Sequence, residues 1–324
     1  MALEFAVTEE LILLFAQPLL LFVFSIIVWS LQSFLVTGIS RRFIFPSFYK
    51  NKITTFFVAQ ISIFVHEMSH FLSAIFTGSS IVGEETFVTA TQGRVTAASE
   101  ESVIGWFSRM IAALAPSFVP PLIFLIIFFL VSGQTPELIT KFTYPKTIDA
   151  FQTMLTTKFI DVVIPNLSVL ILSIINFTNP LTFLFIYLLI VCSIAAGPSE
   201  GDWKATLSLF LSPISIIALL VIFLFLSIAF AQFNLSFVIP LMLLIAFIFV
   251  VVMIGIFYAF LVSQLLSIAY KNVGYAIALL IVFFAIYYAM YYFAQDVIVS
   301  FSSSIIVSLA LGAFIKTRNK HNKH

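Results

Sequence analysis

The sequence predicts an all-α polytopic membrane protein of about eight or nine transmembrane helices, with a small β-hairpin inserted after one of them. Of its 324 residues, 62% are hydrophobic and 9% are charged, whereas a soluble domain has about 25% charged residues. The mean hydropathy is +1.17. We therefore expect a multi-pass integral protein of the cell membrane, with most of its surface facing the lipid bilayer.

Charge and cysteine content exclude several classes of protein. The formal net charge is +1, which provides no basic stripe for binding nucleic acid. Cys192 is the single cysteine, so an intrachain disulfide and a multi-cysteine zinc module are both excluded. We expect Cys192 to lie in the core.

The apolar stretches set the number of spans, because a helix needs about 20 residues to cross a hydrocarbon core of about 30 Å. Stretches that approach or exceed this length lie at 11–36, 53–77, 103–132, 180–197, 207–231, 235–265, 273–295 and 297–315. The stretch 163–177 is ambiguous: it is a short extra span, a re-entrant piece, or the lower half of a long helix kinked at Pro180. Residues 133–162 mix polar and apolar side chains, and we expect them at an interface.

Residues 78–102 break the helical pattern. They are polar, and β-branched residues lie on either side of Gln92-Gly93. This pattern is typical of a β-hairpin.

The stretch 53–77 carries the motif His66-Glu67-Met68-Ser69-His70. Helical spacing puts residues i and i+4 on one face, so the two imidazoles can bind one ion while Glu67 points about 100° away. A zinc hydrolase needs this arrangement: two neutral nitrogens on the metal, and a carboxylate that takes a proton from water. We therefore predict a Zn²⁺ site with His66 and His70 as ligands and Glu67 as the general base.

Further polar residues follow the same side of this helix. At 3.6 residues per turn, an arc of about 100° contains Thr55, Ser62, His66, Ser69, His70, Ser73 and Thr77. A polar stripe on an apolar span indicates a face that lies against the bundle interior or a water-filled cavity. The alternative is that these side chains only hydrogen-bond neighbouring helices.

A catalytic zinc ion takes three protein ligands and keeps one position for water. The other two histidines, His321 and His324, lie in the polar tail. The best third ligand is Asp202, with Glu200 second, because both lie where one apolar segment ends and the next begins. Ser199-Glu200-Gly201-Asp202 also has the form of a capping box, which is compatible with a ligand role.

These motifs together resemble the site-2 protease family of intramembrane zinc metalloproteases. The resemblance rests on HEMSH at 66–70, the hairpin-like stretch 85–99, the run 109–121 and PSEGD at 198–202. It departs from better-known members in having Gly201-Asp202-Trp203 where they carry an Asp-Gly pair, and is closer to divergent prokaryotic members. It implies three regions: an N-terminal helix and basic loop at 1–52, a metalloprotease-like catalytic core at 53–210, and additional helices with a basic tail at 211–324.

The resemblance implies an endopeptidase that hydrolyses transmembrane protein substrates by Glu67-assisted attack of zinc-bound water. A transmembrane helix must unwind before water can attack it, and an exposed strand can then capture it by β-augmentation. The candidate strand residues are Phe87, Val88, Thr89 and Val95. A hairpin that only packs over the bundle is the alternative.

Two other functions stay open. A membrane metal-handling or transport protein would use the same His/His/Asp site, but it predicts further polar residues on several helices. A non-catalytic helix-binding scaffold would not need Glu67. The prolines at 116, 120 and 121 are expected to kink the helix at 103–132.

Overall fold

The computed structural model describes residues 2–81, 87–88, 93–94, 97–98, 102–133, 147–211, 217, 221, 225 and 238–321. In this part of the chain, five helices are long and apolar enough to cross a membrane, which indicates a membrane protein. They are Leu19–Phe48, Ile104–Ser132, Asp149–Ile175, Ile239–Lys271 and Val273–Ala294, and two shorter apolar helices are Leu181–Ala195 and Val297–Ser308. The predicted helical membrane class is confirmed, whereas the count of eight or nine spans stays a prediction.

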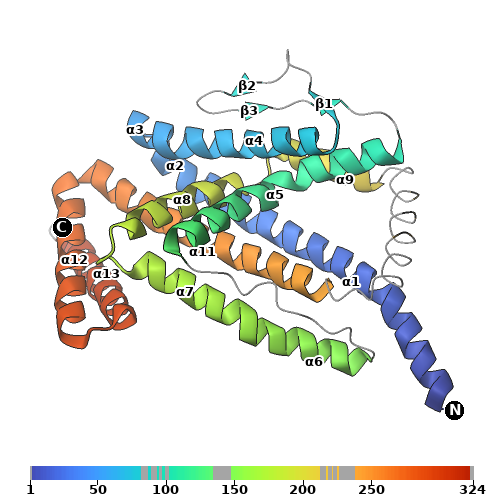
Figure 1. The fold of residues 1–324 in the computed structure, drawn as a ribbon. Helices are drawn as coiled ribbons and strands as arrows, with labels where there is room; N and C mark the ends of the chain where they lie inside the picture. The colour runs from blue at the N-terminus through green and yellow to red at the C-terminus, as the bar shows by residue number, and fades with distance from the viewer. Residues whose placement is uncertain are drawn as a thin grey trace.

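Figure 1 shows the order of the elements, in which η denotes a π-helical segment. The first half of the chain contains α1 (Ala2–Ile39), η1 (Ser40–Ile44), α2 (Phe45–Phe48), α3 (Lys52–Thr54), η2 (Thr55–Gln60), α4 (Ile61–Phe76), α5 (Val103–Ser132) and α6 (Ile148–Lys158). The second half contains η4 (Phe159–Val163), α7 (Ile164–Ile175), α8 (Leu181–Ala195), α9 (Glu200–Leu211), α11 (Val238–Lys271), α12 (Val273–Ala294) and α13 (Val297–His321).

The helix that carries the HEMSH motif has defined ends. Asn51 caps it by accepting the amide N–H of Ile53 at 2.8 Å, and α3, η2 and α4 then follow without a break. At the other end Gly78 has a φ of +72°. Its N–H donates to the Ile75 carbonyl, and the Ser79 N–H donates to the Ala74 carbonyl. This is a Schellman motif, which needs a residue such as glycine in the left-handed region.

The polar stripe of this helix faces the protein, as predicted. Ser62, Ser69 and Ser73 are buried, whereas Phe64 and Phe76 are exposed. The Ser69 hydroxyl donates to the Val65 carbonyl at 2.8 Å, and the Ser73 hydroxyl donates to the Ser69 carbonyl at 2.7 Å. These two hydroxyls are therefore satisfied by their own helix, and the histidines are left to contact the neighbouring helices.

The core lies between α5, α8 and α11, which pack side by side in the middle of the molecule (Figure 1). Phe128, Leu189 and Phe247 are fully buried there, and the buried Cys192 joins the same cluster, as predicted. Gly255 lets α11 approach α8 closely. A Cβ atom at this position would lie 2.7 Å from the Leu189 carbonyl oxygen, so only glycine fits without a shift of the backbone.

The segment after α5 differs from the prediction. Residues 148–175 form one continuous helix through α6, η4 and α7, and Asp149–Ile175 is long enough to span a membrane. Residues 148–162 are therefore part of this helix, and the position of 133–162 at an interface stays a prediction. A single helix kinked at Pro180 is wrong, because α7 ends at Ile175 and α8 starts at Leu181, whose N–H donates to the Asn179 side chain at 3.0 Å.

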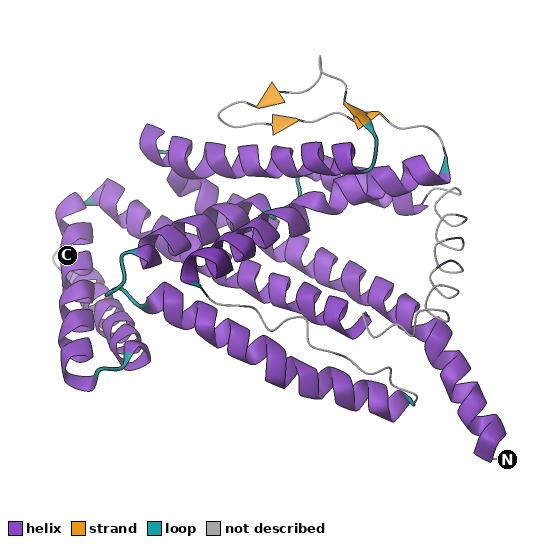
Figure 2. Cartoon of the chain, in the orientation of Figure 1, coloured by secondary structure: helices purple, strands orange, loops and turns teal. Residues whose placement is uncertain are grey.

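Two short antiparallel pairs follow α4 (Figure 2). Strand β1 (Ser80–Ile81) pairs with β4 (Ala97–Ala98), and β2 (Phe87–Val88) pairs with β3 (Gly93–Arg94). β1, β2 and β3 contact α4. Each strand has two residues, and the candidates Thr89 and Val95 lie outside the described residues. A continuous hairpin over 86–98, within the polar stretch 78–102, therefore stays a prediction.

Candidate metal centre

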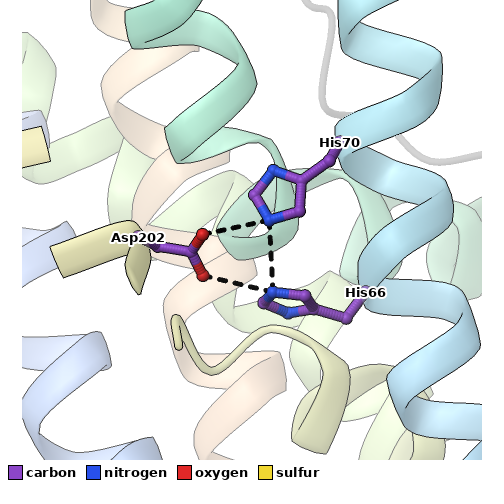
Figure 3. A group of neighbouring side chains, drawn as sticks. All are labelled: His66, His70 and Asp202. Atoms are coloured by element: carbon purple, nitrogen blue, oxygen red, sulfur yellow. Dashed lines mark hydrogen bonds and ion pairs between the residues drawn. The ribbon is translucent and has the colours of Figure 1, made fainter. Parts of the chain in front are cut away.

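Three of the predicted site residues meet between α4 and α9 (Figure 3). His66 Nε2 lies 3.2 Å from Asp202 Oδ2, and His70 Nε2 lies 3.1 Å from Asp202 Oδ1. The two Nε2 atoms are 3.3 Å apart. The three residues can hold a metal ion, because one ligand atom from each lies within 4.8 Å of the others.

Backbone carbonyls fix which nitrogen of each histidine faces the centre. His66 Nδ1 lies 2.8 Å from the Ala195 carbonyl oxygen, and His70 Nδ1 lies 2.8 Å from the Ala112 carbonyl oxygen. A carbonyl oxygen only accepts, so each Nδ1 carries the proton and donates it. In a neutral imidazole the other nitrogen then has its lone pair free, and both Nε2 lone pairs point into the centre.

The donor set fits a metal cation. Two lone pairs and a carboxylate at these distances repel one another unless positive charge lies between them. Two ligand atoms that are each about 2.0 Å from a tetrahedral zinc ion lie about 3.3 Å apart. The two Nε2 atoms, 3.3 Å apart, match that edge length. Each Nε2 lies at a similar distance, 3.1 or 3.2 Å, from a different oxygen of the Asp202 carboxylate.

Asp202 is held by the start of its own helix. The Ser199 N–H donates to Asp202 Oδ2 at 2.6 Å, and the Asp202 N–H donates to Ser199 Oγ at 3.1 Å. This reciprocal pair is the predicted capping box. The same carboxylate therefore caps α9 and faces both histidines, which agrees with the expectation that the two roles are compatible.

The end of α8 completes the arrangement. Ala195 is the last residue of that helix, and the last four carbonyls of a helix have no partner within it. In a continued helix the Ser199 N–H would donate to the Ala195 carbonyl, but it donates to Asp202 instead. The Ala195 carbonyl is left available to His66.

The remaining candidates are placed as follows. Glu67 is buried, with 7% of its surface exposed, in the same turn as His66. Glu200 is the first residue of α9, and its side chain lies outside the described residues. Trp203 contacts Trp29 of α1, with ring centroids 4.7 Å apart. The sequence did not indicate the Ala112 and Ala195 carbonyls, because backbone acceptors carry no residue-type signal.

The fold and this centre define a helical membrane protein with a His–His–Asp group able to bind a metal ion, in which His66 and Asp202 are buried and His70 is partly buried. Comparisons with protein-family models, curated proteins and solved structures found no match.

Proposed function

We propose that the protein is a zinc-dependent intramembrane endopeptidase, similar in its site to the site-2 proteases. The observation that carries the proposal is the convergence of His66, His70 and Asp202 between helices of a membrane protein. Two imidazole nitrogens and one carboxylate suit zinc and leave one position of a tetrahedral site open. An open position is typical of catalytic zinc sites, whereas structural sites have four protein ligands.

Glu67 is the proposed general base and acid. It follows His66 directly in α4 and is buried beside the ligand pair. A zinc ion held by the three ligands would supply the Lewis acidity that peptide hydrolysis needs. Glu67 would take a proton from the attacking water and return it to the leaving amine. This proton transfer separates a hydrolase from a site that only stores metal.

The proposed substrate is a transmembrane protein segment. Its peptide groups are already hydrogen-bonded within their own helix, so it must unwind locally before hydrolysis. Strands β2 and β3 contact α4, the helix that carries both histidines. An unwound segment that adds to the Phe87–Val88 strand would regain main-chain hydrogen bonds against the helix that carries the histidines.

A metal-transport role has less support. A permeation path uses successive polar sites on several helices. Among the residues that the structure describes, one group of three or more His, Cys, Asp or Glu side chains is arranged to hold a metal ion. Its ligands are also held by hydrogen bonds to three backbone groups, which favours a retained ion over one in transit.

We also propose that the chain crosses the cell membrane eight or nine times, with a hairpin over 86–98. The two shorter apolar helices and the apolar stretch 207–231 support a count above five. Cysteines introduced one per loop, in a Cys192→Ser background, test this topology. Successive loops should react with an impermeant reagent from alternate sides of the membrane. If two neighbouring loops react from the same side, the segment between them does not cross the membrane.

The catalytic proposal is tested by metal content and cleavage together. We would measure zinc in detergent-purified wild type, His66→Ala and Glu67→Gln, and follow a co-expressed reporter with one apolar transmembrane segment. Wild type and Glu67→Gln should each carry about one zinc ion per chain, His66→Ala should carry none, and only wild type should cleave. Wild type without zinc after reconstitution, or cleavage by Glu67→Gln at the wild-type rate, would overturn the proposal.

A further inference from the structure

The third predicted span contains three prolines inside one continuous helix. Pro116, Pro120 and Pro121 all lie within α5. A proline has no N–H, so the carbonyl four residues before it loses its helical hydrogen bond. Pro116 therefore releases the Ala112 carbonyl, and Pro121 releases the Ser117 carbonyl. A released carbonyl in a membrane helix needs another donor.

Side chains of two neighbouring helices supply those donors. His70 of α4 donates its Nδ1–H to the Ala112 carbonyl at 2.8 Å. Gln32 of α1 donates its Nε2–H to the Ser117 carbonyl at 3.0 Å. The Gln32–Ser117 bond is buried and the His70–Ala112 bond is partly buried, so leaving either carbonyl unpaired is costly. Two prolines of α5 thus each free a carbonyl that accepts a side chain from another helix. One of these side chains, His70, belongs to the metal centre.

We propose that Pro116 is a positioning residue for the metal ligand His70. By releasing the Ala112 carbonyl, it provides the acceptor that fixes the ring orientation of His70 and leaves its Nε2 lone pair facing Asp202. His66 needs no such residue, because its acceptor is a carbonyl at the end of α8. The inference rests on the metal centre described above, and it assigns Pro116 a role in metal affinity and none in proton transfer.

Replacing Pro116 restores a competing donor. In Pro116→Ala the new N–H can bond the Ala112 carbonyl along the helix, and His70 then shares or loses its acceptor. Loss of such an outer hydrogen bond lowers metal affinity about 10–100-fold in other sites. Pro116→Gly restores the same N–H on a more flexible backbone. The pair of variants therefore separates the effect of the N–H from that of backbone stiffness.

Pro121→Ala is the matched control. It makes the same substitution in the same helix, five residues further on. The carbonyl that it affects is that of Ser117, which accepts from Gln32 and not from a histidine. We would titrate zinc into metal-free wild type and the three variants against a competing chelator. We expect Pro116→Ala and Pro116→Gly to bind zinc at least tenfold more weakly than wild type, and Pro121→Ala to bind within about twofold of wild type. Equal weakening by Pro116→Ala and Pro121→Ala, or wild-type affinity in both Pro116 variants, would overturn the proposal.

A second measurement does not depend on metal or on cleavage. In the ¹⁵N NMR spectrum of metal-free protein, the His70 Nδ1–H should give a hydrogen-bonded signal in wild type and Pro121→Ala, whatever the state of Nε2, and this signal should shift or weaken in the Pro116 variants. An unchanged His70 signal in the Pro116 variants would contradict the proposal. Neither the zinc titration nor the NMR measurement depends on peptide hydrolysis. A protein that binds zinc but cleaves nothing would therefore contradict the proposed function without contradicting this inference.

Discussion

His66 Nε2 lies 3.2 Å from Asp202 Oδ2, although 136 positions separate the two residues in the sequence. The contact depends on α5 and α8, because α4 packs against both and α9 packs against α5. These two helices also supply the carbonyls that orient the histidines. The metal centre is therefore built by four helices, of which only α4 and α9 carry ligands.

The first prediction separates the two roles of Asp202. Asp202→Asn keeps a side-chain oxygen for the Ser199 N–H but replaces the charged ligand, so we expect at least tenfold weaker zinc binding. Ser199→Ala removes the cap acceptor of the Asp202 N–H, which typically costs about 1 kcal/mol of stability. Zinc titration and thermal unfolding of both variants measure the two effects.

Glu200→Gln is the control for that experiment, since it neutralises a carboxylate in the same first turn of α9. We expect its zinc affinity to equal that of wild type. If Glu200→Gln lost zinc binding and Asp202→Asn kept it, Glu200 and not Asp202 would be the third ligand.

Metal removal should lower stability. A ligand that binds only the folded state stabilises it by about 2.7 kcal/mol at one hundred times its Kd. We expect chelated wild type to unfold at a lower temperature than the zinc-loaded protein, and His66→Ala to show no difference with or without zinc. A zinc-dependent shift of equal size in His66→Ala would place the bound metal elsewhere on the chain.

Replacing either of two helical glycines by alanine should change stability in opposite directions. A Cβ on Gly255 would lie 2.0 Å from Ser193 Oγ and 2.7 Å from the Leu189 carbonyl oxygen. We expect Gly255→Ala to cost about 1–3 kcal/mol through overpacking. Gly38 in α1 has nothing within 4 Å of an added Cβ, so Gly38→Ala should stabilise by about 0.5–1 kcal/mol. Unfolding of both variants in mixed micelles tests this, and equal effects would argue against the close approach of α8 and α11.

Asp296 provides a prediction remote from the centre. Its Oδ1 accepts the Ile298 and Val299 N–H groups at 2.7 and 3.1 Å, so Asp296 caps the start of α13. Asp296→Ala should cost about 1 kcal/mol of stability, whereas Asp296→Asn should cost less because Asn is also a good cap. Zinc content should be unchanged in both, and a loss of zinc would mean that α13 supports the metal centre.

The sequence by itself determined the features that depend on local spacing and composition. The apolar content predicted a helical membrane protein, and the i, i+4 spacing placed both histidines on one face of α4. The capping-box pattern at Ser199 and Asp202 was also predictable, because it is formed within four residues.

Only the tertiary structure decided which groups meet those residues. Residues 148–162 continue into the stretch 163–177 as one helix, and composition alone did not predict that the two are continuous. The acceptors of His66 and His70 are backbone carbonyls of Ala195 and Ala112, which any residue type can provide. The Ala195 carbonyl is available because α8 ends there, and the Ala112 carbonyl is available because Pro116 follows it by four residues. The packing of α4 brings the histidines to these two carbonyls.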